Sequence, residues 1–315
     1  MTSTQDLPRR PLGSTGLQIT SLTIGAGPLG SMPANFGYEV PAERGIATAV
    51  AALTGPVNAL DTSNSYSRGE SERRVGEALR QIGGLPEGYV LSTKLDRDLD
   101  TGEFTGDRMR RSIEESLERL GLDRVPLLHL HDPEHIGFAE SMVPGGPVEV
   151  LVQLRDEGIA GAIGVAGGPI DMLREFVATD VFDAVLTHNR WTLVDRSAGP
   201  LIEEAAARGL GVINAAVFGG GILAAGARAS SRYAYREAEP ELLAAVAEIE
   251  RLCGEHGVPL GAAAVQFSTR DPRIATTVVG VSRPERIAGS VELATVPIPD
   301  ALWSEVDAVV AGLAR

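Results

Sequence analysis

The segment Tyr89–His131, YVLSTKLDRDLDTGEFTGDRMRRSIEESLERLGLDRVPLLHLH, contains the repeating unit that decides the fold. It begins with a β-rich run, Tyr89–Leu95, and ends with a second one, Leu127–His131. Between them, Asp107–Leu120 repeats apolar residues at helical spacing, and Gly121 follows as a stop signal. The segment therefore predicts two parallel strands joined by a helix.

The same alternation continues in both directions, from about residue 22 to residue 300. The predicted strands are Leu22–Gly25, Ala59–Thr62, Tyr89–Leu95, Leu127–His131, Ala162–Val165, Phe182–His188, Gly211–Ala216 and Ala275–Gly280. Besides Asp107–Leu120, the predicted helices include Glu72–Arg80, Val148–Glu157, Leu201–Arg208 and Glu239–Glu255. Eight strands with a helix after nearly every one, without internal repeat or linker, favour a single (β/α)8 TIM barrel domain over residues 1–315.

Three segments outside this rhythm are also informative. Arg10–Thr20 has short extended arms around Gly13–Gly16, which predicts an amino-terminal β-hairpin that could plug the bottom of the barrel. The longer stretches Pro133–Pro147 and Ala224–Pro240 follow the fourth and seventh strands. In a barrel these loops lie on the catalytic face, so we expect them to shape the substrate pocket.

Composition excludes several classes of partner. The chain has 315 residues, 43% of them hydrophobic, and a net charge of −14 without any Lys/Arg cluster longer than a pair, which argues against nucleic acid and anionic membrane surfaces. Met1–Arg10 is polar, and no run approaches the roughly 18 apolar residues of a membrane span, so we expect a cytoplasmic protein. Cys253 is the only cysteine and lies on a helical apolar stripe, which predicts a buried hydrophobe.

Lysine usage singles out one position. Lys and Arg together number 28, and lysine occurs only at Lys94, so the other 27 are arginine. A single surviving surface lysine would be the simplest explanation. However, lysine differs from arginine in its compact ammonium and in a pKa that neighbours can shift, so position 94 could require that chemistry.

A candidate proton-transfer centre lies at the ends of strands two to four. Its four residues are Asp61, Tyr66, Lys94 and His131. The pKa of a phenol is about 10, and an ammonium such as that of Lys94 would lower the pKa of Tyr66. Asp61 would keep the lysine protonated, and His131 could hold a carbonyl oxygen. Each residue alone has a structural explanation, but four at successive strand ends favour a catalytic one.

The motifs around these residues resemble those of the aldo-keto reductases. They are Leu60–Tyr66 with Gly69–Glu72 and Gly76, Ser92–Lys94, Leu130–Pro133, and the opening Leu12–Leu17. The resemblance implies a barrel that binds NAD(P)H without a Rossmann domain and transfers a hydride to or from an aldehyde, ketone or aldose. It also implies Tyr66 as general acid/base, Lys94 and Asp61 tuning it, and His131 orienting the substrate. The His-Asp-Pro ending and the glycine loop resemble the branch containing D-threo-aldose (L-fucose) and pyridoxal dehydrogenases.

The resemblance also implies a cofactor site. Its residues are Gly25, Ala26, Asp61, His188, Phe218, Gly219, Gly220, Gly221, Gly280, Arg286 and Ser290. The chain departs from the family where Ala166-Gly167 replaces Ser-Asn, Ala215 replaces a stacking Tyr, and Gly280 replaces a lysine for the 2′-phosphate. Arg286, with Arg283, could still pair with a 2′-phosphate, so the resemblance favours NADP(H) over NAD(H).

Three other interpretations compete. Gly25–Gly30 matches the GxGxxG pattern of Rossmann domains, but Pro33 and Gly37 follow where a helix should begin. His129 and His131 alternate onto one strand face, as in a metal-dependent barrel hydrolase, although the eighth strand ends without a final acidic ligand. A non-catalytic, cofactor-binding accessory protein is the third class. Bound zinc would favour the hydrolase, and aldehyde turnover that is lost in Tyr66→Phe would favour the reductase. The sequence does not indicate an oligomeric state.

Overall fold

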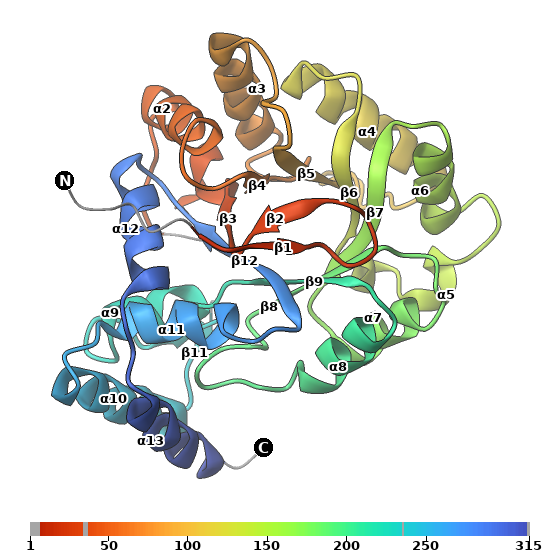
Figure 1. Ribbon diagram of the computed structural model, residues 1–315. Coiled ribbons are helices and arrows are strands. Elements are labelled where there is room, and N and C mark those ends of the chain that lie inside the picture. Colours follow the sequence, from red (N-terminus) through yellow and green to blue (C-terminus); the bar gives the residue numbers. More distant parts are fainter. Residues whose placement is uncertain (1–6, 34–36, 235, 314–315) are drawn as a thin grey trace.

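The computed structural model describes residues 7–33, 37–234 and 236–313, so the extreme ends of the predicted 1–315 domain lie outside the described residues. All eight predicted strands form, and they close into one parallel barrel in the order β12-β3-β4-β5-β6-β7-β8-β9 (Figure 1). The barrel strands are β3 (Leu22–Gly25), β4 (Ala59–Asp61), β5 (Val90–Leu95), β6 (Val125–His131), β7 (Ala160–Gly167), β8 (Ala184–His188), β9 (Gly211–Ala215) and β12 (Ile274–Gly280). The predicted (β/α)8 barrel is confirmed.

Helices surround the barrel on its outer side (Figure 1). The longer ones are α2 (Ala42–Leu53), α3 (Glu70–Ile82), α4 (Gly106–Leu120), α6 (Pro147–Asp156), α7 (Ile170–Val177), α8 (Gly199–Ala207), α10 (Pro240–Glu255), α11 (Leu260–Thr269), α12 (Glu285–Thr295) and α13 (Asp300–Ala311). In α4 the Thr105 hydroxyl caps the amide of Arg108 at 3.2 Å, and Gly121 ends the helix with a φ of 70°. None of the described helices combines the length and apolar character needed to cross a bilayer.

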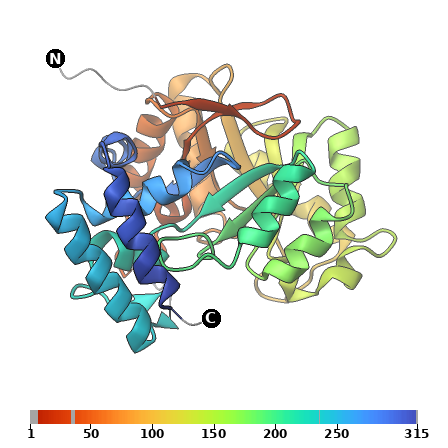
Figure 2. The ribbon, with the colours of Figure 1, turned by 60° about the horizontal axis from the view of Figure 1, so that its bottom comes forward.

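The predicted amino-terminal hairpin is also confirmed. Strands β1 (Arg9–Pro11) and β2 (Gln18–Thr20) pair antiparallel and lie across one end of the barrel (Figure 2). The amide of Ser14 donates to the carbonyl of Gly209 at 3.0 Å, just before β9 begins, so this is the amino-terminal end of the strands. Leu12 of the hairpin is fully buried, so the hairpin packs against the amino-terminal end of the barrel.

Small residues make room inside the barrel for two long polar side chains. Alternate residues of a strand face inward, and on β7 the inward positions are taken by Ala162, Gly164 and Ala166. A Cβ at Gly164 would come within 2.6 Å of the ring carbon Cε1 of His129. Lys94 on β5 is among the largest fully buried side chains. The glycine and alanines of β7 therefore allow the side chains of His129 and Lys94 to lie inside the barrel.

Candidate active site

Lys94 lies at the centre of the carboxyl-terminal mouth. It is the fifth residue of β5, and its side chain is 1% exposed. Its Nζ donates to Asp61 Oδ2 at 2.6 Å, to the Thr62 carbonyl at 2.6 Å and to the Tyr66 hydroxyl at 3.4 Å. Ser92, also facing inward from β5, donates from Oγ to the other oxygen of Asp61 at 2.7 Å. Both oxygens of the Asp61 carboxylate are thus held, and the ammonium is directed at the phenol.

Burial and charge oppose each other at this centre. Burial disfavours the charged form of Lys94, but the charges of Asp61 and Tyr66 outweigh it and raise the pKa of the ammonium above its ordinary value. Burial also raises the pKa of the Tyr66 phenol, by more than Lys94 lowers it. Lys94 thus lowers the pKa of Tyr66 as expected, and the larger opposing effect is the loss of water, which a sequence does not show. Tyr66 stays protonated at neutral pH.

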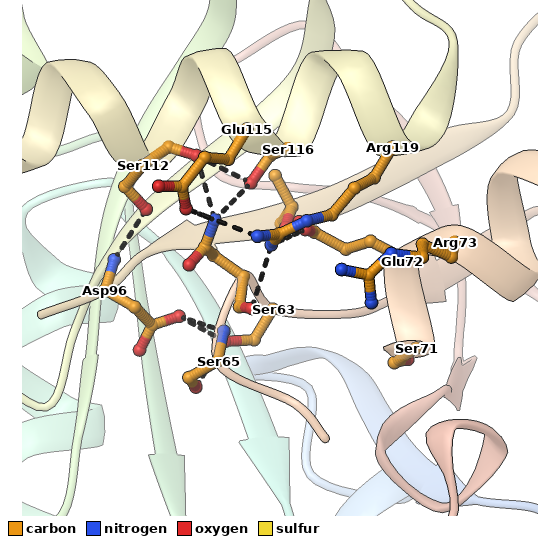
Figure 3. A network of polar contacts seen from close by, with 12 residues as sticks. Ser63, Ser65, Ser71, Glu72, Arg73, Asp96, Ser112, Glu115, Ser116 and Arg119 are labelled. Carbon is orange, nitrogen blue, oxygen red and sulfur yellow. Dashed lines mark hydrogen bonds and ion pairs between the residues drawn. The ribbon is translucent and has the colours of Figure 1, made fainter. Parts of the chain in front are cut away.

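The loop that carries Tyr66 is fixed from outside by a polar network on α4 (Figure 3). Asn64 donates from Nδ2 to the Ser112 carbonyl and to Glu115 Oε2, both at 3.0 Å, and accepts from Arg108 at 3.1 Å. Arg119 donates to the Asn64 carbonyl at 3.2 Å. Every polar atom of the Asn64 side chain is thereby engaged, so the loop is anchored to α4.

The same network reaches a buried acid on α3. Glu72 has a fully buried side chain that accepts from Thr93 Oγ1 at 2.6 Å and from Arg119 at 3.1 Å (Figure 3). Burial raises the pKa of Glu72 despite these donors. The acids and arginines of this network were not predicted as functional, because each alone is typical of a solvent-facing helix surface.

His131 completes the cluster from the end of β6. Its ring meets the Tyr66 ring edge-on, with centroids 5.8 Å apart and planes at 79°. Its Nδ1 lies 2.6 Å from Asp96 Oδ1. The structure thus brings all four predicted residues to one mouth, together with Asp96, which sequence reasoning missed. The available signal was an acidic residue two positions after Lys94.

The predicted cofactor residues at the strand ends lie close to this cluster. Gly25 of β3 pairs with Gly280 of β12, and a Cβ at Gly25 would lie 3.3 Å from the Gly280 Cα atom. The amide of Ala26 donates to the Asp61 carbonyl at 2.8 Å. Gly30, the last glycine of the GxGxxG pattern, ends the 3-10 helix η1 (Gly27–Gly30) instead of opening an α-helix. The segment Gly25–Gly30 is therefore a barrel loop whose backbone lies beside Asp61 of the candidate site.

The glycine loop after β9 has a backbone that only glycine adopts readily. Phe218 precedes the 3-10 helix η3 (Gly219–Gly221), whose φ angles are 57°, 80° and 111°. A Cβ at Gly221 would meet nothing within 4 Å, so the backbone there is open to a ligand. The short hairpin of β10 (Arg232–Tyr233) and β11 (Arg236–Glu237) lies within the predicted loop 224–240, of which Tyr235 is outside the described residues. Such a glycine run fits an anionic pyrophosphate.

The end of β8 offers an unused acceptor. His188 Nδ1 lies 3.1 Å from Asn189 Nδ2, and burial lowers the pKa of His188 to about 4, so its ring is neutral. Among the described residues, the buried Asn189 Oδ1 has no hydrogen-bond partner. An amide donor such as the nicotinamide carboxamide would satisfy it. Together with the glycine loop, this acceptor shows that the residues present fit a nicotinamide dinucleotide.

The remaining predicted contacts lie on α12, apart from the cluster. Arg286 is exposed in the first turn, and the buried Ser290 donates from Oγ to the Arg286 carbonyl at 2.8 Å. Within the described chain, no side-chain hydrogen bond or ion pair joins α12 to Asp61, Tyr66, Lys94 or His131. At the end of β7, the chain has Ala166-Gly167 where the family has Ser-Asn. The space that a side chain at Gly167 would need is taken by Glu134, and Glu134 Oε1 accepts a hydrogen bond from the amide of Gly168.

The structure gives the metal-site interpretation no support. Within residues 7–33, 37–234 and 236–313, no group of three or more His, Cys, Asp or Glu side chains could hold a metal ion. Burial lowers the pKa of His129 to about 3, and neither of its nitrogens has a partner in the described structure.

Comparisons with known proteins agree with this geometry. Residues 21–311 match the Aldo/keto reductase family. The chain is 33% identical to D-threo-aldose 1-dehydrogenase from a Pseudomonas species, over 93% of this chain and 94% of that protein. It is 29% identical to pyridoxal 4-dehydrogenase from Microbacterium luteolum, over 94% and 95% of the two chains. A solved structure, a putative aldo-keto reductase from Pseudomonas aeruginosa, shares the fold with a TM-score of 0.66 at 24% identity, over 93% of this chain and 98% of that chain. The chain therefore belongs to the aldo/keto reductase family and is an NAD(P)-dependent oxidoreductase that acts on carbonyl or alcohol substrates.

Proposed function

We propose that Tyr66 exchanges the proton while a hydride moves between the nicotinamide and a carbonyl carbon. When bound, the dinucleotide supplies or accepts the hydride. The observation that carries the proposal is the buried Lys94 ammonium, 2.6 Å from Asp61 and 3.4 Å from the Tyr66 hydroxyl. A positioned acid of this kind contributes roughly 10²- to 10⁴-fold to rate.

Each residue has a separate task in this proposal. In carbonyl reduction, the protonated phenol of Tyr66 donates its Oη proton to the oxygen that gains charge. Lys94 stabilises the phenolate left behind, and Asp61 keeps the lysine charged and correctly directed. His131 holds the substrate oxygen by a hydrogen bond. In alcohol oxidation the same groups act in reverse, and the phenol first has to lose its proton.

The Tyr66→Phe variant tests the role of the phenol. It removes one oxygen and should lower turnover of an aldehyde such as 4-nitrobenzaldehyde by at least 10²-fold. NADPH binding, followed by quenching of protein fluorescence, should be unchanged. In Lys94→Arg, a planar guanidinium replaces the compact ammonium, so turnover should also be lost. The circular dichroism spectrum should remain that of the folded wild type. Wild-type rates in either variant would remove that residue from the mechanism.

The dinucleotide is NADP(H) in this proposal. Arg283 and Arg286 are exposed near the start of α12, and neither takes part in an ion pair within the described part of the chain, so a 2′-phosphate could pair with a guanidinium fork. A hydrogen bond to a charged group is worth about 1.5–3 kcal/mol, so Arg286→Ala should weaken NADPH binding roughly 10- to 100-fold and leave NADH binding unchanged. Equal affinities of the wild type for NADPH and NADH would contradict this role.

The substrate is a small aldehyde, ketone or aldose in this proposal. The two relatives are named for D-threo-aldoses and for pyridoxal, and both compounds carry or mask an aldehyde. The pocket walls would come from the loops 133–147 and 224–240. Tyr233 of the second loop donates from its hydroxyl to the Asn189 carbonyl at 2.7 Å, which ties that wall to the end of β8.

A further inference from the structure

Asp96 lies one residue beyond the end of β5, and its side chain is 6% exposed. Its carboxylate accepts three hydrogen bonds: Oδ1 from His131 Nδ1 at 2.6 Å, and Oδ2 from the Ser65 amide at 3.0 Å and from the Ser63 hydroxyl. Its backbone is held as well, because its amide donates to Ser112 Oγ at 3.0 Å (Figure 3). This residue is therefore immobilised by its own contacts.

The three donors fix the protonation of Asp96. Burial by itself would raise the pKa of Asp96, but the nearby His131 and the hydrogen bonds outweigh burial and hold the pKa below its ordinary value. An ionised carboxylate can only accept, so the hydrogen between Asp96 and His131 belongs to Nδ1. The other ring nitrogen, Nε2, is then the one that remains for a substrate oxygen.

A histidine whose Nδ1–H is engaged can donate from Nε2 only if the ring carries both protons. We infer that Asp96 is a positioning residue that holds His131 as an imidazolium, so that the substrate oxygen meets a charged donor at Nε2. The inference rests on the proposed function, which places the substrate oxygen against His131. A charge-assisted hydrogen bond is about twice as strong as a neutral one, and it strengthens as the oxygen gains negative charge during reduction.

Other titratable groups also face the ring. Lys94 of β5 lies with its partner Asp61 of β4, and Tyr66 comes from the loop after β4. His129 comes from β6, and Asp132 and Glu134 come from the loop after it. His188 comes from the end of β8. Burial and Lys94 disfavour a charged His131, whereas Asp96 and Asp132 favour it, and the net effect raises the pKa of His131. Asp132 Oδ1 is 3.7 Å from Nε2, and the Asp132 side chain is 36% exposed, so it is the weaker of the two acids.

The experiment is a pH titration of the full chain labelled with ¹³C,¹⁵N-histidine, followed by NMR. The His131 signals are assigned from their loss in His131→Gln. In the wild type we expect the midpoint to lie above about 6.5, the ordinary histidine value. In Asp96→Asn, which keeps the size of the side chain and removes its charge, the midpoint should fall by about 1 to 3 pH units.

Matched variants separate charge from structure. Asp132→Asn removes the other nearby acid and should shift the midpoint less than Asp96→Asn does. Asp96→Glu restores a carboxylate and should recover part of the shift. A wild-type midpoint at or below about 6.5 would overturn the inference, and this measurement needs no variant to fold. An unchanged midpoint in folded Asp96→Asn would overturn it as well.

Kinetics test the link to the substrate. In NADPH-dependent reduction of 4-nitrobenzaldehyde, the alkaline limb of kcat/KM should follow the NMR midpoint of His131. That limb should move to lower pH in Asp96→Asn by the same number of pH units. If the midpoint moves and the limb does not, His131 does not hold the substrate oxygen, and the proposed function fails at that residue. If neither moves, the inference about Asp96 alone fails.

Discussion

Replacing Lys94 by methionine tests the buried charge pair directly. Methionine has nearly the length of lysine and no charge, so Lys94→Met leaves the Asp61 carboxylate buried without its partner 2.6 Å away. The Asp61 side chain is 6% exposed, so water cannot replace the ammonium easily. Removing one member of a buried ion pair costs about 3–5 kcal/mol, and we expect the free energy of unfolding to fall by that amount.

A double variant distinguishes the lost charge from lost packing. In Lys94→Met with Asp61→Asn, no uncompensated charge remains, and Ser92 can still donate to the side-chain amide oxygen introduced at position 61. Replacing both members of a buried pair by neutral groups is often close to neutral, so most of the lost stability should return. Turnover should not return, because the Tyr66 phenol still lacks its neighbouring cation.

Urea unfolding followed by circular dichroism measures the stability of these variants, and kcat/KM for an aldehyde measures turnover. Arg251→Met is the control for deleting a cation on the surface, since the Arg251 side chain is 50% exposed, and it should unfold at the wild-type urea concentration. Wild-type stability of Lys94→Met would show that Asp61 does not depend on the ammonium. Turnover by the double variant would show that the reaction does not need Lys94.

Two further predictions concern stability. Burial lowers the pKa values of His129 and His188 to about 3 and about 4. Below about pH 6.5 the unfolded chain therefore binds protons at these histidines that the folded chain does not bind. The free energy of unfolding should then decrease as the pH falls below 6.5, by roughly 1.4 kcal/mol per pH unit for each histidine. Urea unfolding at pH 7 and pH 5 should show a smaller difference in His129→Leu than in the wild type, and an equal difference would exclude the contribution of His129. Gly76→Ala should cost about 1–3 kcal/mol, because its Cβ would lie 3.0 Å from Leu120 Cα on α4, whereas Gly289→Ala on α12 meets nothing within 4 Å and should gain up to about 1 kcal/mol. Equal unfolding midpoints for these two variants would contradict the close packing of α3 on α4.

The strands could be predicted because their signals are local. Buried parallel strands are short apolar runs, and Leu22–Gly25 was predicted with the bounds of β3. Helix α4 could also be predicted from local signals, because its apolar stripe marks the buried face and Gly121 marks the carboxyl-terminal end. By contrast, α7 and α12 were not singled out, since a short amphipathic run has no comparable boundary signal.

The candidate site could be predicted only in part, for a different reason. Asp61, Tyr66, Lys94 and His131 follow from strand ends and residue type, but Asp96 acquires its meaning from a contact with His131, 35 residues further along the chain. In sequence it is one of several acids in the loop LDRDLD. The ring of Trp191 likewise packs on a residue far along the chain, Phe267 of α11, with centroids 5.4 Å apart. Such pairings depend on the closed barrel and are not encoded in any single segment.

The protonated state of Lys94 has a chemical consequence for an enzyme that acts on carbonyl compounds. A free amine condenses with an aldehyde to an imine, and lysines that form Schiff bases need a lowered pKa. Here the pKa is raised and the ammonium is bound to oxygens on two sides, so no lone pair is available to attack. Since all other basic residues except histidine are arginine, no other lysine can form such an adduct. A carbonyl compound can therefore lie beside Lys94 without forming a covalent imine with it.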